Sequence, residues 1–197
     1  DINDAFADKE VKAIISSIGG DDSVRVLPYL DADIIRNNPK ILMGYSDTST
    51  LLTYCNQLGL VTFNGPAIMA GFSQAENLPK EFGEHVKAIL FDNPAKYRYL
   101  PYEKYWEGYA DWSKSENVGL VKNEHSREDW HWLQGESVVQ GHLFGGCLEV
   151  LEFFVKGTKY WPSEDFWKGK ILFLETSEEK PTVDTVKYTL RGLGAQG

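Results

Sequence analysis

An apolar strand that leads straight into a helix sets the fold class of this chain. Residues Ile41–Tyr45 are mostly apolar, residues 46–50 form a short polar turn, and Leu51–Leu58 has the pattern of a helix that stops at Gly59. A second apolar strand, Leu60–Phe63, follows at once. A strand, a helix and a strand at this spacing predict a βαβ unit, so we expect an α/β fold with a parallel sheet.

The other expected elements surround a segment rich in aromatic residues. They are a helix at the start of the chain (1–10), strands at 11–18, 137–143 and 171–175, and helices at 80–91, 182–193 and from Gly145-Gly146 through Val155. Between Tyr97 and Trp132, nine aromatic residues occur within 36 positions without a clear period. We therefore expect an extended loop or linker there, crossing a domain boundary.

Charge and composition exclude several classes of partner. The chain has 20 Lys and Arg residues against 29 Asp and Glu residues, a net charge of −9, which disfavours nucleic-acid polymers and anionic membranes. Two cysteines, Cys55 and Cys147, make no disulfide framework, so we expect a reducing, cytoplasmic setting. No histidine or cysteine spacing typical of a metal site occurs, and we expect neither a metal nor another cofactor.

Ser46 stands in the context that a nucleophilic serine requires. The run Gly44-Tyr45-Ser46-Asp47-Thr48 lies between a strand and a helix, where a tight turn exposes the hydroxyl. The backbone N–H of Asp47 then lies at the helix N-terminus and can hold an oxyanion. The alternative is that Ser46 or Asp47 simply caps the helix.

Two further features lie where strands are expected to end. Gly19-Gly20 closes the first strand, where ligands bind in open α/β sheets, although a plain turn explains the pair equally well. Glu175 directly follows four apolar strand residues and can serve as the carboxylate that orients a histidine; the alternative is an acidic loop. None of the four histidines, His85, His125, His131 and His142, has a signature of a general base.

Six motifs in order resemble one known family. They are residues 5–15 (AFADKEVKAII), 18–22 (IGGDD), 44–49 (GYSDTS), 62–66 (TFNGP), 141–148 (GHLFGGCL) and 171–179 (ILFLETSEE). Together they resemble the LD-carboxypeptidase family of serine peptidases (family S66). The last motif and the long aromatic insert are most similar to its microcin C immunity branch. The resemblance covers nearly the whole chain, with Cys147 where the family usually has Asn.

The resemblance implies a Ser-Glu-His triad in which Ser46 is the nucleophile and Glu175 the acidic member. It implies an oxyanion hole formed by the backbone N–H groups of Asp47 and Gly20. We also assign Gly19, Trp112, Trp132 and Lys180 to substrate binding. In the family the triad histidine follows the glutamate motif at a distance, and a βα unit precedes the segment that starts here. We therefore expect a fragment that lacks both ends and is a poor enzyme by itself, unless His142 substitutes as the base.

The resemblance divides the chain and leaves more than one activity open. We expect an α/β nucleophile domain at 1–95, an aromatic-rich linker or insert at 96–136, and part of a mixed α/β C-terminal domain at 137–197. Members of the immunity branch cleave the amide of peptidyl or aminoacyl nucleotides, and we favour this activity because a purine needs an aromatic partner. The alternatives are removal of D-Ala from murein tetrapeptides and a non-catalytic, aromatic-rich binding module. The aromatic residues can also simply pack the insert, and we expect a homodimer.

Overall fold

The computed structural model describes residues 1–196 as a mixed α/β fold in two compact units. The first unit comprises Asp1–Ala67 and the chain from Val138 onward, and the second comprises Ile68–Ser137. The α/β class with a parallel sheet is the predicted one, whereas the expected domain boundaries at 95/96 and 136/137 stay a prediction. In residues 1–196 no helix has the length and apolar character needed to cross a membrane.

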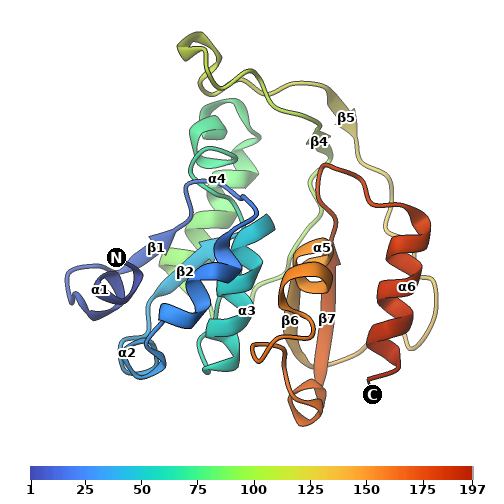
Figure 1. The fold of residues 1–197 in the computed structure, drawn as a ribbon. Coiled ribbons are helices and arrows are strands. Elements are labelled where there is room, and N and C mark those ends of the chain that lie inside the picture. Colours follow the sequence, from blue (N-terminus) through green and yellow to red (C-terminus); the bar gives the residue numbers. More distant parts are fainter. Residues whose placement is uncertain (197) are drawn as a thin grey trace. The chain divides into compact units, whose positions relative to one another are not determined.

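A three-stranded parallel sheet organises the first part of the first unit (Figure 1). Its strands are β1 (Ala13–Ile15), β2 (Ile41–Gly44) and β3 (Phe63–Asn64), in the order β1-β2-β3. Helix α3 (Ser49–Gln57) connects β2 to β3, so the predicted βαβ unit is confirmed. Strand β2 lies in the middle of the sheet, and its carboxyl end carries Ser46.

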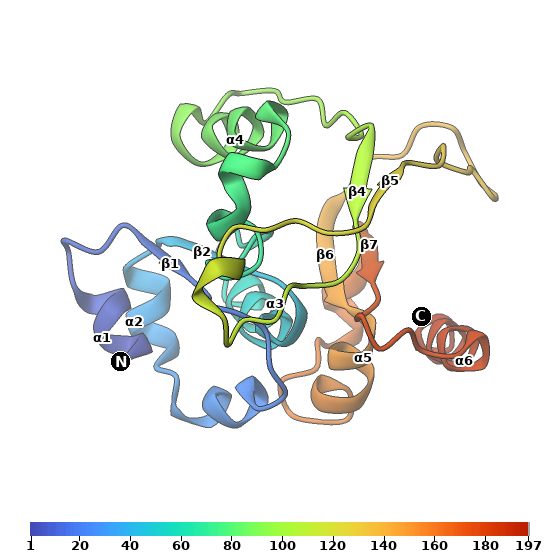
Figure 2. The same ribbon diagram turned by 90° about the horizontal axis from the view of Figure 1, so that it is seen from above.

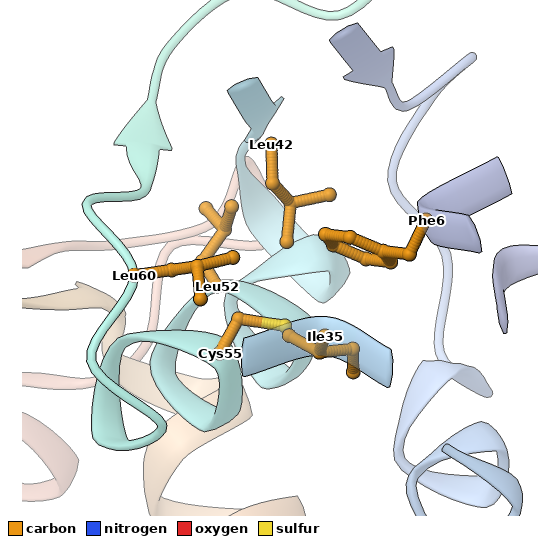
Figure 3. Close-up of a cluster of buried hydrophobic side chains, with 6 residues drawn as sticks. All are labelled: Phe6, Ile35, Leu42, Leu52, Cys55 and Leu60. Atoms are coloured by element: carbon orange, nitrogen blue, oxygen red, sulfur yellow. The ribbon is translucent and has the colours of Figure 1, made fainter. Parts of the chain in front are cut away.

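Two short helices contribute side chains to the hydrophobic core beside this sheet. Helices α1 (Ile2–Ala7) and α2 (Ala32–Asn37) contribute Phe6 and Ile35, and a 3-10 helix at Ser23–Tyr29 lies before α2 in the chain. The remaining buried members of the cluster are Leu42, Leu52, Cys55 and Leu60 (Figure 3). Burial of one such side chain stabilises the fold by about 1.5–3 kcal/mol, so this cluster fixes α3 against β2.

A second, two-stranded parallel sheet belongs to the same unit. Strand β6 (His142–Cys147) pairs with β7 (Lys170–Glu175), with His142 opposite Lys170 and Cys147 opposite Glu175. After β6 come α5 (Leu148–Val150), a π-helical turn at Leu151–Val155 and a 3-10 helix at Glu164–Trp167; α6 (Val183–Gly194) follows β7. Figure 2 shows α3 between β2 and the pair β6 and β7.

The structure corrects the expected boundaries around Gly145-Gly146. The pair does not open a helix; it lies inside β6, and the helix starts at Leu148. Residues 137–141, expected as a strand, are not part of one. Gly146 has φ +149°, and a side chain there would collide with Ser49 of α3, so the close approach of helix and strand requires glycine. The first strand is also shorter than expected, and the first helix ends at Ala7.

The second unit contains all nine aromatic residues counted between Tyr97 and Trp132. It has a 3-10 helix at Phe72–Asn77, α4 (Lys80–Lys87) with a π-helical turn at Ala88–Asp92, a 3-10 turn at Ser115–Asn117, and the antiparallel strands β4 (Lys104–Trp106) and β5 (Glu124–Ser126). The segment expected as an extended loop thus carries a β-ribbon. Cross-strand pairs stabilise the ribbon: Tyr105 stacks on His125 with ring centroids 5.1 Å apart, and Lys104 pairs with Glu124 at 2.6 Å.

Candidate active site

Ser46 occupies the turn between β2 and α3. Tyr45 is extended, and Ser46 has φ +55° and opens a 3-10 turn, Ser46–Thr48, that continues into α3. A left-handed conformation costs a residue other than glycine about 1–2 kcal/mol, so the surrounding contacts must hold it. The structure confirms the predicted position of Ser46. It does not support the capping alternative, because the N-cap positions are Tyr45 and Thr48 and neither makes a side-chain cap.

Gly19 leaves open the space beside the Ser46 hydroxyl. A Cβ atom on Gly19 would lie 2.8 Å from Ser46 Oγ and 3.7 Å from the backbone nitrogen of Asp47. The hydroxyl, this nitrogen and the Gly19 backbone therefore share one small region. The first N–H groups of a helix have no partner within the helix, so the Asp47 N–H is suited to hold a negative oxygen there.

Asp47 connects the Ser46 turn to the loop that follows Gly20. Its side chain is 5% exposed, and its Oδ2 accepts a hydrogen bond of 2.9 Å from the backbone N–H of Ser23. Its carbonyl oxygen accepts hydrogen bonds from the hydroxyls of Ser23 (2.6 Å) and Thr50 (3.0 Å). The sequence reasoning missed Ser23 and Thr50. Their only signal is that they are hydroxyl residues close to Gly20 and Ser46, which is too common to single them out.

Glu175 ends β7 and faces the Ser46 turn. The backbone N–H of Ser46 donates a hydrogen bond to its carboxylate, while Glu175 Oε1 is buried and has no partner among the described residues. Burial raises the pKa of Glu175; the Ser46 hydrogen bond opposes this, and Glu149 and Glu178 add to the rise. The structure thus brings together Gly19, Gly20, Ser46, Asp47 and Glu175, all in the first unit.

A second carboxylate, Glu149, supports the loop after Glu175. Ser177 donates to Glu149 Oε1 from its backbone N–H (3.1 Å) and from its hydroxyl (2.7 Å). Cys147 Sγ lies 3.6 Å from Glu149 Oε2, and burial raises the pKa of this thiol to about 11. Glu149 therefore fixes the first residues beyond β7 and contributes negative charge beside Glu175.

His142 lies at the wrong end of its strand to act on Ser46. It pairs with Lys170 at the start of β6 and β7, whereas Cys147 pairs with Glu175 at their end. Five residue steps along a strand span about 16 Å, far beyond hydrogen-bond reach. The structure thus contradicts the idea that His142 serves as the base. The other histidines, His85, His125 and His131, belong to the second unit.

Three predicted binding residues remain, one in the first unit and two in the second. Lys180 is exposed in the turn after β7, with φ +54°, and its N–H bonds to the Ser177 carbonyl. Trp112 and Trp132 belong to the second unit, and both are exposed. Trp112 packs edge-on against Tyr109 and lines a pocket of about 190 Å³ together with Met69, Lys114 and Leu120. Trp132 donates its Nε1–H to the Gly135 carbonyl at 3.2 Å.

Two family models match this chain. The model of the LD-carboxypeptidase N-terminal domain matches residues 1–65, and that of the LD-carboxypeptidase C-terminal domain matches residues 140–197. Together they cover more than half of the sequence. Within the described residues, no group of three or more His, Cys, Asp or Glu side chains could hold a metal ion.

Individual relatives agree with these matches. The chain is 32% identical to the microcin C7 self-immunity protein MccF of Escherichia coli, over 91% of this chain and 51% of that protein. It is 30% identical to the probable murein peptide carboxypeptidase of Bacillus subtilis, over 92% of this chain and 47% of that protein. The solved structure of MccF in complex with aspartyl sulfamoyl adenosine matches with a TM-score of 0.81 at 31% identity, covering 98% of this chain and 56% of that chain.

The mixed α/β fold is accompanied by matches to both the N-terminal and the C-terminal domain of one peptidase family. The chain belongs to the LD-carboxypeptidase family, peptidase family S66, as its motifs indicated. It spans about half the length of the curated relatives it matches.

Proposed function

We propose that the whole protein is a serine amidase that cleaves the amide joining an amino acid or peptide to a nucleotide, as in microcin C and aminoacyl sulfamoyl adenylates. The observation that carries the proposal is the left-handed Ser46 at the end of the central strand, beside side-chain-free Gly19 and the Glu175 carboxylate. In this proposal Ser46 is the nucleophile, Glu175 the acidic triad member, and the N–H groups of Asp47 and Gly20 the oxyanion hole.

The reaction follows from this geometry. Ser46 Oγ attacks the carbonyl carbon and gives its proton to an imidazole oriented by Glu175. The negative oxygen of the tetrahedral intermediate is held by the two N–H groups. The C–N bond then breaks, the imidazole protonates the leaving nitrogen, and water hydrolyses the acyl-serine. Glu175 Oε1 supports this role, because it is buried without a partner and can accept the imidazole N–H.

In this proposal the imidazole is not that of His142, the histidine of the first unit, because His142 lies at the opposite end of β6 from Cys147 and Glu175. We therefore propose that this chain by itself hydrolyses substrate slowly or not at all, since an unassisted hydroxyl is a weak nucleophile at neutral pH. Comparing turnover by residues 1–197 with turnover by the protein as its gene encodes it tests this point. Equal rates would refute it.

The proposal that the substrate contains a nucleotide depends on Trp112. This side chain lines a mostly apolar pocket that also includes the charged Lys114, and such a lining suits a flat base next to phosphate or sulfamate. The relative solved with aspartyl sulfamoyl adenosine supports a ligand of this class. Murein peptide is the second candidate, supported by the Bacillus subtilis relative, and it offers no aromatic group to Trp112.

Hydrolysis of aspartyl sulfamoyl adenosine and of a murein tetrapeptide by the gene-encoded protein decides between the two substrates. Trp112→Ala should weaken binding of the sulfamoyl adenosine by about 1–3 kcal/mol, and the matched Trp130→Ala, at an exposed tryptophan that does not line the pocket, should change it little. Preferential release of D-Ala, with no effect of Trp112→Ala, would favour the murein substrate. Failure of a fluorophosphonate to label Ser46 would favour a non-catalytic binding module.

Two further expectations accompany this function. The free, buried thiols of Cys55 and Cys147 suit a reducing compartment, so we propose action in the cytoplasm. We also propose a homodimer, which the mass in solution measured by light scattering tests directly.

A further inference from the structure

We propose that the side chain of Asp47 is a positioning residue that fastens the loop 20–23 to the Ser46 turn and so sets the place of the Gly20 N–H. The proposal rests on the proposed function, since it assigns the part of the oxyanion hole that Asp47 does not supply itself. It concerns the carboxylate of Asp47, whereas the hole uses its backbone N–H.

Three hydrogen bonds carry the proposal. Ser23 donates its backbone N–H to Asp47 Oδ2 (2.9 Å) and its hydroxyl to the Asp47 carbonyl (2.6 Å), and Thr50 donates its hydroxyl to the same carbonyl (3.0 Å). The hydroxyls of Ser23 and Thr50 also contact each other. The loop after β1 is thereby joined to both the turn and the first residues of α3.

The loop is short enough to transmit this constraint. Only Asp21 and Asp22 separate Gly20 from Ser23. Both are exposed, and Asp22 pairs with Arg25, which follows Ser23 in the same segment. Gly20 lies against Asp47 Oδ2, because a Cβ atom there would be 3.4 Å from this oxygen. Without the Asp47 carboxylate, the loop would lose the bond from the Ser23 N–H and keep the bond from the Ser23 hydroxyl to the Asp47 carbonyl, so Gly20, at φ +153°, would be held less firmly.

The burial of Asp47 indicates that its position serves function more than stability. The side chain is 5% exposed, and its Oδ1 is buried with no partner among the described residues. A buried carboxylate with one oxygen unsatisfied carries a desolvation cost. A residue kept at such a cost beside a nucleophilic turn is expected to hold that turn in a defined arrangement.

The test uses the gene-encoded protein and four variants. Asp47→Ala removes the acceptor, Asp47→Asn keeps an oxygen that can accept from the Ser23 N–H, and Ser23→Ala removes one of the two Ser23 hydrogen bonds. Asp31→Ala is the matched control: Asp31 also accepts backbone N–H groups, those of Asp33 and Ile34, but caps α2 away from Ser46. Hydrolysis of aspartyl sulfamoyl adenosine gives kcat and KM, and amide hydrogen exchange follows residues 20–23.

We expect Asp47→Ala to lower kcat by about tenfold to hundredfold with KM little changed, because an oxyanion donor acts on the transition state. Asp47→Asn should recover most of kcat, Ser23→Ala should lie between, and Asp31→Ala should keep the original kcat. Amide exchange at residues 20–23 should become faster in Asp47→Ala and should stay unchanged in Asp31→Ala.

Other results overturn the proposal. They are an unchanged kcat in Asp47→Ala, an equal loss in Asp47→Asn, or a loss that lies entirely in KM. If the unmodified protein hydrolyses no amide, the proposed function fails by itself. Hydrogen exchange then still tests whether Asp47 holds the loop, and unchanged exchange at residues 20–23 in Asp47→Ala would refute this role.

Discussion

Replacing Gly19 by alanine is the most direct test of the space beside Ser46. The added Cβ would lie 2.8 Å from Ser46 Oγ and 2.9 Å from Ser46 Cβ. Carbon atoms in contact are normally about 3.5–4.0 Å apart, so one partner must move by more than half an ångström. Ser46 cannot yield easily, because its left-handed backbone is fixed between β2 and α3.

The magnitude follows from this overlap. Adding a methyl group to a well-packed site costs about 1–3 kcal/mol, which urea unfolding measures as a lower midpoint with an unchanged slope. A nucleophile displaced by about 1 Å loses on the order of 100-fold in rate. We therefore expect Gly19→Ala to lower stability and, in the gene-encoded protein, to lower the rate at which a fluorophosphonate labels Ser46.

Gly194→Ala provides the matched control. Gly194 belongs to α6 of the same unit, and nothing lies within 4 Å of the position its Cβ would take. Alanine there should raise stability by about 0.5–1 kcal/mol and leave labelling unchanged. If Gly19→Ala were as stable and as readily labelled as the unmodified chain, the close approach of Gly19 to Ser46 would be wrong.

Three other predictions concern the core, a carboxylate and a histidine. Phe6→Ala should destabilise the chain by about 3–5 kcal/mol in urea, because Phe6 is fully buried; a loss below 1 kcal/mol would contradict the cluster. The raised pKa of Glu175 means that its favourable contribution exists at low pH and is lost as pH rises through that pKa. Glu175→Gln should therefore gain stability relative to the original chain as the pH rises above the ordinary range of a glutamate pKa, measured by thermal melts, and a difference that stays constant with pH would refute the shift. His142→Ala should leave amide hydrolysis by the gene-encoded protein unchanged, and a loss of turnover without a loss of stability would identify it as the base after all.

The Ser46 turn was predictable because its signals are local. Apolar residues 41–45, a polar turn and a helical pattern follow one another in the sequence, and each indicates its own element. The Gly145-Gly146 pair was misread because its role is set by distant partners. Glycine is needed there because β7 and Ser49 approach it, and neither contact leaves a trace in the neighbouring sequence.

The hydrogen bonds between Asp47 and Ser23 could not be predicted from the sequence, for the same reason. Asp47 and Ser23 are 24 positions apart, and their hydrogen bonds exist only because β1 and β2 are neighbours in the sheet. The order of the strands can be inferred from the βαβ pattern, but the loop geometry that directs the Ser23 N–H to Oδ2 cannot. The positions of Ser46 and Glu175 were therefore predictable, whereas the contacts of Ser23 and Thr50 around the Ser46 turn were not.

Cys147 stands at the position where the resemblance implies Asn in the family. The contact that joins β6 to α3 runs from the Cys147 backbone N–H to Ser49 Oγ at 2.9 Å, so it does not depend on which side chain occupies this position. The thiol itself is buried, and its pKa of about 11 keeps it neutral at physiological pH. A neutral thiol at this position adds no third negative charge next to Glu149 and Glu175. The Cys147 backbone thus links β6 to α3 whatever the side chain is. The neutral thiol adds no charge to those of the Glu149 and Glu175 carboxylates.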